Sequence, residues 1–561
     1  MNNADITERL EDAIELMELM DVNVFKINAF RKLAQSIETE SIQLQQMRPE
    51  QLAGHYSKSM SAVLSELLLR GSFPELEELE REIPAGVRSM LRINGLGPKK
   101  VRHLWKEAGI DTLDLLKTSC LNGTVAQQKG FGEKIQQSIL DGIAFLESIR
   151  GRLLQHKADE WASALELEWK SAGFRNFCRT GHLACWPETL PSLDFLFPAT
   201  NRPEMENWIA SGADQFRLQP EKSGPLHFTV DFPEAGSSLR LFFAHSADWD
   251  KTRLMLESEA AHWQKAAEKG IPFYEAWKKG IPENQIYQHL GKKPVLPELR
   301  QGLFEWEEEF EQEKKLVSYS DVRGCLHNHS LWSDGRNKIS EMAGWCRQQG
   351  WEYFGIADHS QSARYANGLL EDAVHSQWAE IDALNKEFGG KFRILKGIES
   401  DILGDGSLDY HEELLRGFDY VVASVHSIMK MDIRTATTRL IRAIENPYTH
   451  ILGHCSGRIL LRRSGYPLDY EKITDACIAN KVAIELNAHP SRLDMDYHHL
   501  RRALEKGALI AVNPDAHEVS GMDYMRYGIL MARKAGAGKE QILNCLPLEK
   551  ANHFFKKTAY L

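Results

Sequence analysis

Apolar residues recur at helical spacing along the first 150 residues. The runs ITERLEDAIELMELM (6–20) and FKINAFRKLAQSIET (25–39) place apolar side chains every three or four positions, which is the period of an amphipathic helix. Two later segments, INGLGPKKVRHLWKEAGI (93–110) and KGFGEKIQQSILDGI (129–143), each begin with a glycine-containing turn and continue with the same period. The pattern predicts an all-helical region over residues 1–150.

The pattern changes after residue 150. Residues 151–315 combine a helical segment with short apolar runs (SLDFLFP, LHFTVDF, SLRLFFA), which predicts an α+β region. From 320 to 561, short apolar runs such as FGIADH, RILKGIES and YVVASVHS alternate with helical segments. This alternation predicts parallel strands closed into a barrel or distorted barrel. At roughly 100 to 200 residues per domain, three domains fit the length of 561 residues: 1–150, 151–315 and 320–561.

Composition narrows the class of protein. Hydrophobic residues make up 43% and charged residues 26%, which is typical of globular proteins. The net charge of −11 argues against a protein that coats nucleic acid by bulk electrostatics, although local contacts could still bind it. No basic leader precedes an apolar stretch, and no apolar run approaches the roughly 18 residues of a membrane span. We therefore expect a cytoplasmic protein without membrane contact, and the eight scattered cysteines fit a reducing compartment.

Metal-competent residues follow the expected strands of the C-terminal region. Twelve of the 21 histidines lie between positions 327 and 517. A single histidine at a strand end is typically a hydrogen-bonded structural residue, but nine candidate ligands on successive strand ends indicate a metal centre. Nitrogen and oxygen ligands without thiolate suit Zn²⁺, Mn²⁺ or Fe²⁺. The candidates are His327, His329, Asp334, His359, Glu399, His426, His454, Asp515 and His517.

The motifs around these residues resemble a known family. HNHS…D, ADHS, GIESDIL, SVHS, GHCSGR, ELNAHPSRLD and DAH are similar to the motif set of the PHP (polymerase and histidinol phosphatase) domain, over essentially all of 320–561. The resemblance implies a metal-dependent phosphoesterase on a distorted (βα)7 barrel that holds three divalent metal ions. It implies a first metal held by His327, His329, Glu399 and Asp515, a second held by Glu399, His426 and His454, and a third held by Asp334, His359 and His517. Among these, Glu399, Asp515 and His517 are the expected catalytic residues.

Two arginines near the expected ligands are candidates for holding a substrate phosphate. Arg458 follows the GHCSG run and Arg492 lies in the ELNAHPSRLD run. Guanidinium groups suit this role because their N–H donors match phosphate oxygens in pairs. The alternative for each is a salt-bridged surface arginine.

The two turn–helix segments of the N-terminal region resemble helix-hairpin-helix motifs, which grip the DNA backbone without reading its sequence. Backbone N–H groups at such a helix start can hold a phosphate. Residues 1–150 carry 18 basic and 22 acidic side chains, so we expect a local, salt-sensitive grip. A plain helix–helix connection is the alternative. The candidate DNA contacts are Gly95, Gly97, Lys99 and Lys100 in the first segment and Gly130, Gly132 and Lys134 in the second.

The order of the segments resembles a bacterial-type family X DNA polymerase with a C-terminal PHP domain, over nearly the full length. Its polymerase site requires an Asp-x-Asp pair and a third carboxylate on a neighbouring strand. This chain has Ser192-Leu193-Asp194, and Arg240 stands at the third position, with Asp231 as a different candidate carboxylate. A two-metal site that loses two of three carboxylates binds Mg²⁺ poorly. We therefore expect no magnesium at this degenerate site and absent or very weak polymerase activity.

The favoured function is a DNA-processing metal-dependent phosphoesterase, a 3′-5′ exonuclease or 3′-end-cleaning enzyme of DNA repair. Three alternatives stay open: an active family X repair polymerase with a PHP exonuclease, a small-molecule phosphomonoesterase of histidinol phosphatase type, and a DNA-binding scaffold with a structural metal cluster. The expected partner is DNA, and the sequence contains no signal for an oligomeric state.

Overall fold

The computed structural model describes residues 3–38, 44–47, 49–93, 95–212, 215–279, 281–289, 291, 293–307, 316–390 and 392–556. They belong to two compact units, residues 1–150 and 151–561. The domain boundary expected between residues 315 and 320, which would separate the middle region from the barrel, stays a prediction. No helix in the described ranges is long and apolar enough to cross a membrane.

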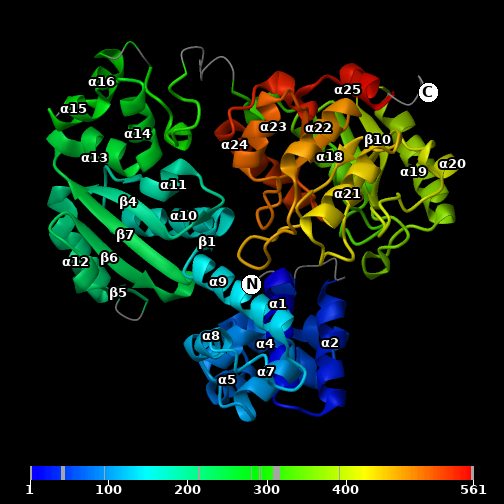
Figure 1. Ribbon diagram of the computed structural model, residues 1–561, viewed down its shortest axis with the longest axis horizontal. Helices are drawn as coiled ribbons and strands as arrows, with labels where there is room; N and C mark the ends of the chain where they lie inside the picture. Colours follow the sequence, from blue (N-terminus) through cyan, green and yellow to red (C-terminus); the bar gives the residue numbers. More distant parts are fainter. Residues whose placement is uncertain are drawn as a thin grey trace. The chain divides into compact units, whose positions relative to one another are not determined.

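The first unit is helical, as predicted (Figure 1). Its core forms because apolar residues at helical spacing face inward; in the first helix Leu10, Ile14 and Met17 are buried. Phe30 and Phe73 stack at 5.8 Å in the same core. Its helices are α1 (Asn3–Leu19), α2 (Val24–Glu38), α3 (Pro49–His55), α4 (Lys58–Arg70), α5 (Pro74–Glu82), α6 (Ala85–Leu91), α7 (Pro98–Lys106), α8 (Leu113–Leu121) and α9 (Glu133–Ile149).

The second unit begins with a five-stranded mixed sheet in the order β2-β4-β7-β6-β5. Strands β4 and β7 are parallel, and the other pairs are antiparallel. Trp169 packs edge-on against Phe195 and Phe197 in the core beneath the sheet. The strands are β2 (Cys178–Arg179), β4 (Ser192–Pro198), β5 (Arg217–Leu218), β6 (His227–Phe232) and β7 (Ser237–Ala244), with a small β1 (Leu153–Leu154) and β3 (Thr189–Leu190) pair.

Two longer helices of this region pack on the core of the sheet, and the helices after β7 form a separate core. The helices of the region include α10, which supplies Trp169 to the core, and α11, which leads into the segment before β3. The helices are α10 (Gln155–Ser171), α11 (Gly181–Cys185), α12 (Arg202–Ser211), α13 (Trp249–Leu256), α14 (Ala260–Glu268), α15 (Phe273–Lys278) and α16 (Glu283–His289).

Seven parallel strands follow in sequential order and curve into a nearly closed barrel (Figure 1). A parallel bridge between Asn328 and Ala516 joins the two ends of the sheet beyond its first and last strands. Most strand residues are buried, because helices cover the outside of a parallel barrel while side chains fill its inside. The strands are β8 (Gly324–Cys325), β9 (Tyr353–Ile356), β10 (Arg393–Asp401), β11 (Tyr420–Ser424), β12 (Ile451–Leu452), β13 (Ala483–Asn487) and β14 (Ile510–Asn513).

The βα alternation predicted from the sequence is confirmed by this order of elements. The barrel helices are α18 (Ile339–Gln348), α19 (Glu371–Phe388), α20 (Glu412–Leu415), α21 (Ile433–Ile444), α22 (Tyr470–Ala479), α23 (Tyr497–Glu505), α24 (Met525–Lys534) and α25 (Leu548–Phe555). The carboxyl ends of the parallel strands meet at one rim, where active sites of such barrels are built.

Candidate metal centre

Nine side chains converge at the carboxyl ends of the barrel strands, and they are the nine candidate ligands of the sequence. They form four overlapping groups, and in each group the potential ligand atoms lie within 4.8 Å of one another. Most belong to a strand end or to the loop directly after it, which is why distant sequence positions meet here. The groups are His329, Asp334, His359 and His517; His327, His329 and Asp515; His327, Glu399 and His454; and His359, Glu399 and His426.

Glu399, near the end of β10, connects two of these groups. Its Oε1 lies 3.2 Å from His327 Nε2, 3.2 Å from His426 Nε2 and 3.0 Å from His454 Nε2. Its Oε2 lies 3.0 Å from His359 Nδ1. Burial alone would raise the pKa of Glu399, but the surrounding histidines hold it well below its ordinary value. The carboxylate is therefore ionised and able to bridge cations.

Asp515, just after β14, occupies the other side of the cluster. Its Oδ1 lies 3.1 Å from His329 Nε2. Asp334 Oδ2 lies 3.4 Å from His517 Nε2 and 3.6 Å from His359 Nε2. Burial, together with the neighbouring His517 and His359, lowers the pKa of His329 to about 4, so this imidazole is neutral near pH 7 and its lone pair is free to bind a metal.

Several imidazole nitrogens in the cluster suit metal ions better than protein partners. Nδ1 of His329 is buried without a hydrogen bond, and Asp334 Oδ1 lies 3.7 Å away. Nε2 of His327 is also buried without a hydrogen bond, although a Glu399 oxygen is near. Buried polar atoms without partners are rare unless a ligand satisfies them. The donor set of imidazole and carboxylate groups could therefore hold divalent metal ions.

Two carboxylates that the sequence analysis did not single out hold the imidazoles in place. Glu485 in β13 accepts a hydrogen bond from His327 Nδ1 at 2.7 Å and one from the backbone N–H of His454 at 2.7 Å. Asp401 at the end of β10 lies 2.5 Å from His426 Nδ1. Such partners fix the orientation of a metal-ligating histidine. The available signal was their place within the quoted motifs, ELNAHPSRLD and GIESDIL.

The two candidate phosphate-binding arginines have different surroundings. Arg492 Nε lies 3.6 Å from Asp515 Oδ2, at the edge of the cluster. Arg458 instead forms a bidentate ion pair with Glu188, with 2.7 Å from Nη2 to Oε1 and 3.1 Å from Nη1 to Oε2. The structure therefore brings Arg492 to the candidate ligands and directs the Arg458 guanidinium toward Glu188.

The degenerate polymerase-like residues meet on the middle sheet. Asp194 of β4 is the register partner of Arg240 of β7. Arg240 Nε lies 2.7 Å from Asp194 Oδ1, and its Nη2 lies 2.5 Å from Oδ2. Ser192 Oγ donates to Oδ1 at 2.7 Å. Asp231, the different candidate carboxylate, accepts a hydrogen bond from Gln219.

The candidate DNA contacts lie at two helix starts in the first unit. Gly95 has a φ of +91°, and Gly97 immediately precedes α7; Gly130 has a φ of +84°, and Gly132 immediately precedes α9. Glycine is favoured where φ is positive because a side chain strains the backbone in this conformation. The side chains of Lys99 and Lys134 are exposed, whereas Lys100 is partly buried.

The two turns of the first unit lie near one another. Lys100 Nζ is 6.0 Å from the ring centre of Phe131, and His103 stacks on the same ring at 5.8 Å. A surface groove of about 610 Å³ borders the first turn and is lined by Gly95, Gly97 and Lys99 among others. The groove is also lined by the acidic residues Glu18 and Asp21, so it carries both signs of charge.

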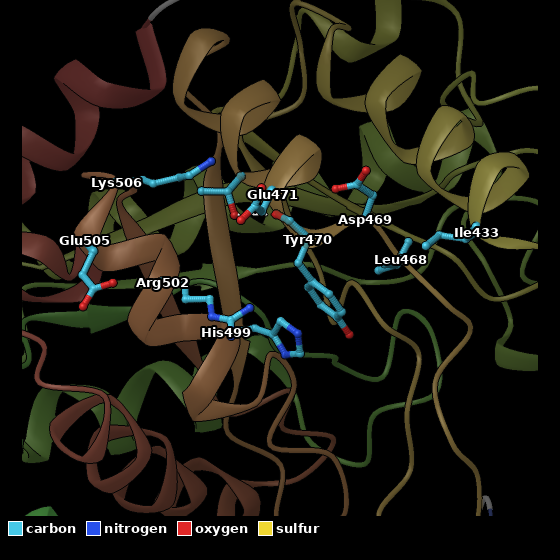
Figure 2. Close-up of a pocket in the computed structure, with 10 residues that line it drawn as sticks. Ile433, Leu468, Asp469, Tyr470, Glu471, His499, Arg502, Glu505 and Lys506 are labelled. Atoms are coloured by element: carbon cyan, nitrogen blue, oxygen red, sulfur yellow. Dashed lines mark hydrogen bonds between the residues drawn. The ribbon is translucent and has the colours of Figure 1, made fainter. Parts of the chain in front are cut away.

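A separate groove of about 560 Å³ lies on the outside of the barrel and includes none of the nine candidate ligands (Figure 2). Figure 2 shows His499 of α23 beside the ring of Tyr470 of α22, with 3.7 Å between the ring centres. Lys506 pairs with Asp475 at 2.8 Å. Side chains of both charges line this groove, among them Glu505 and Lys506.

Comparisons with known proteins can now be set beside this geometry. The family model described as a PHP domain matches residues 326–489. The DNA polymerase/3'-5' exonuclease PolX of Bacillus subtilis (strain 168) is 33% identical over 576 aligned residues, covering 99% of this chain and 100% of that protein.

Two further similarities each cover less than half of this chain. A "Probable phosphatase" of Thermoanaerobacter sp. (strain X514) is 28% identical over 230 residues, 39% of this chain and 88% of that protein. The crystal structure of a histidinol phosphate phosphatase from Lactococcus lactis subsp. lactis, complexed with zinc, L-histidinol and phosphate, has 18% sequence identity and a TM-score of 0.30, covering 38% of this chain and 94% of that one.

Proposed function

This chain belongs to the PolX family, and from that membership and the geometry of its metal centre we propose that it is a DNA-processing, metal-dependent phosphoesterase. The proposed reaction is hydrolysis of a phosphodiester at the 3′ end of DNA, as a 3′-5′ exonuclease or in the cleaning of damaged 3′ ends during repair. The carrying observation is a contrast between two sites: nine potential ligands converge in the barrel, whereas Asp194 in the polymerase-like region is ion-paired with Arg240.

Three divalent ions, of zinc, manganese or iron, are the proposed cofactors of the barrel. The nine side chains would hold them, because imidazole and carboxylate ligands suit these metals. Bound there, the ions would place positive charge beside the phosphate oxygens and activate water as the nucleophile. Glu399, Asp515 and His517 are the proposed catalytic residues among the ligands.

The chain's own residues would orient the substrate and the ligands. Arg492 is the proposed contact for a substrate phosphate, because its guanidinium lies at the edge of the cluster and phosphate oxygens match its donors. Glu485 accepts a hydrogen bond from His327 Nδ1, which directs His327 Nε2 toward Glu399. Most of the cluster is buried, which limits the access of bulk water, whereas Asp334 and His517 are partly exposed.

Polymerase activity is proposed to be lost or very weak. Both carboxylate oxygens of Asp194 already accept hydrogen bonds from Arg240, and the backbone N–H of His182 donates to Oδ2 at 3.1 Å. A magnesium ion at this position would have to displace the guanidinium of Arg240 from Asp194. It would also find one carboxylate, whereas two-metal nucleotidyl transfer requires three. Without polymerase activity, the polymerase-like region would serve to bind the substrate and to support the barrel.

DNA binding is proposed for the two turns at Gly95 and Gly130 of the first unit. The starts of α7 and α9, together with Lys99, Lys100 and Lys134, offer contacts to backbone phosphates. These contacts are independent of sequence, which suits an enzyme that acts at DNA ends.

One experiment tests the proposal. The purified protein is incubated with a 5′-labelled primer-template and Mn²⁺, with and without deoxynucleotides, beside an Asp515→Ala variant. We expect shortening from the 3′ end that vanishes in the variant. Lengthening that requires deoxynucleotides and is abolished by Asp194→Ala would overturn the loss of polymerase activity.

A second candidate function is phosphomonoester hydrolysis on a small molecule, favoured by the similarity to a "Probable phosphatase" over most of that protein's length. It leaves residues 1–315 without a purpose. An unchanged DNA substrate together with hydrolysis of small phosphate esters would favour this function over the nuclease.

A further inference from the structure

One contact of the polymerase-like region with the barrel is made by a short segment, residues 185–188, which runs from the last residue of α11 to the residue before β3. Lys534 of α24 donates to the backbone carbonyl of Cys185 at 2.9 Å, and the side chain of Trp186 packs against the core of the barrel. Glu188 completes the contact through its ion pair with Arg458. All these residues lie within the second compact unit.

The Glu188–Arg458 pair is mostly buried and closely matched in shape. Arg458 Nη2 lies 2.7 Å from Glu188 Oε1, and Nη1 lies 3.1 Å from Oε2. The two side chains are 16% and 17% exposed, so water screens the pair far less than it would on an open surface. The positions are 270 residues apart in the chain.

The other donors of Arg458 bind the backbone of the loop that carries Arg492. Nε donates to the carbonyl of Arg492 at 3.0 Å, and Nη2 also donates to the carbonyl of Leu493. A guanidinium has five N–H donors, and four hydrogen bonds are already made within the protein. Arg458 therefore holds this loop and is not directed at a substrate phosphate.

Arg492 itself is placed differently. Its Nε lies 3.6 Å from Asp515 Oδ2, too far for a hydrogen bond but inside the range of an ion pair. Its side chain is 22% exposed, so a phosphate bound at the cluster could reach the guanidinium. Arg458 donates hydrogen bonds to the same stretch of backbone that positions Arg492.

We propose that Glu188 is a positioning residue of the phosphoesterase site, acting through Arg458 on the loop that carries Arg492. The proposal rests on the proposed function and assigns to the polymerase-like region a role in hydrolysis that does not require its lost carboxylates. In this arrangement the region supports the substrate-binding edge of the metal centre.

The test compares Glu188→Gln and Arg492→Ala, alone and combined, in the full-length metal-loaded protein. The amide of the glutamine keeps the shape of Glu188 but loses the charge that holds Arg458. We expect kcat/KM for 3′-end hydrolysis to fall by about 10 to 100-fold in Glu188→Gln, since small displacements of a positioning group have effects of this size. If Glu188 acts through Arg492, the same substitution has little further effect in the Arg492→Ala background.

Glu166→Gln is the matched control. Glu166 of α10 forms an ion pair of comparable exposure with Arg179, at 2.6 Å, inside the polymerase-like region and away from the barrel contact. It should lower kcat/KM by less than about twofold. Metal content, by elemental analysis, and melting temperature should be the same in Glu188→Gln and Glu166→Gln.

A second measurement separates this proposal from the proposed function. The affinity for inorganic phosphate, measured by titration calorimetry, should weaken in Glu188→Gln even if the wild-type protein hydrolyses no DNA. Unchanged phosphate affinity, or an equal loss of kcat/KM with and without Arg492, would overturn the positioning role. Loss of bound metal in Glu188→Gln would overturn it too, by placing the effect in the ligand cluster.

Discussion

Single residues give the carboxylates of the two potential metal sites in this chain different surroundings. In the barrel, Glu399 and Asp515 are buried carboxylates whose pKa values lie well below the ordinary range because histidines surround them, despite the opposing effect of burial. On the middle sheet, Asp194 is equally buried, but its neighbour is Arg240. Each carboxylate is charged; the difference is that the histidines around Glu399 and Asp515 can lose a proton and bind a metal, whereas the guanidinium of Arg240 stays a cation beside Asp194.

Glu485→Gln should lower metal affinity without removing a ligand. Glu485 accepts hydrogen bonds from His327 Nδ1 and from the His454 backbone, and an amide can accept only one of them. Losses of about 10 to 100-fold in affinity are typical when such a partner is changed. Metal retained after dialysis against a chelator is the measurement. Glu505→Gln on the exposed face of α23 should retain wild-type metal content, and a Glu485→Gln variant that does the same would contradict the orienting role.

Asp194→Asn should destabilise the protein at neutral pH. Burial would raise the pKa of Asp194, but hydrogen bonds from His182 and Arg240 outweigh it and hold the pKa below its ordinary value. Breaking such a pair costs about 3 kcal/mol. A depressed pKa contributes stability above the unfolded-state pKa, and this contribution is lost as pH falls through the folded-state value. The difference between wild type and variant in urea unfolding should therefore narrow below about pH 4. Equal stabilities at pH 7 would show that the Arg240 pair contributes nothing.

At the scale of elements, the period of the apolar pattern predicted the helical unit and the βα alternation, and so the strand ends that the candidate ligands follow. Those predictions depend on local spacing. The sequence analysis did not detect Glu485 or Asp401, because their roles come from packing one strand beside another. The Glu188–Arg458 pair could not be predicted from the sequence for the same reason, because 270 residues separate its members. Considered alone, Arg458 has the chemistry of a phosphate-binding residue.

The turns before α7 and α9 carry the proposed contacts to DNA. Lys99→Ala and Lys134→Ala should each weaken DNA binding and reduce the slope of log affinity against log salt by about 1, because each lysine releases about one counterion. Fluorescence anisotropy of labelled DNA across a salt series measures both quantities. Lys117→Ala is the control, since this lysine of the same unit is paired with Glu147 at 2.8 Å. A salt slope unchanged by all three substitutions would indicate that these turns are plain helix connections.

At the scale of the whole molecule, the proposal separates binding from hydrolysis. The lysines of the first unit and the ligands of the barrel belong to different compact units, so their substitutions should have different kinetic signatures. Lys99→Ala should raise KM for DNA and leave kcat nearly unchanged, because the substitution weakens the binding of DNA equally in the ground state and in the transition state.

Asp515→Asn should have the opposite signature. Removing the charge of a proposed ligand should lower kcat by more than about 100-fold, beyond the loss typical of a residue that only orients a ligand. DNA affinity by anisotropy should stay within about twofold of wild type, because the lysine contacts are intact. If Asp515→Asn instead abolished DNA binding and Lys99→Ala left KM unchanged, the barrel alone would recognise the substrate. The first unit would then need another role, and the small-molecule phosphatase would become the stronger candidate.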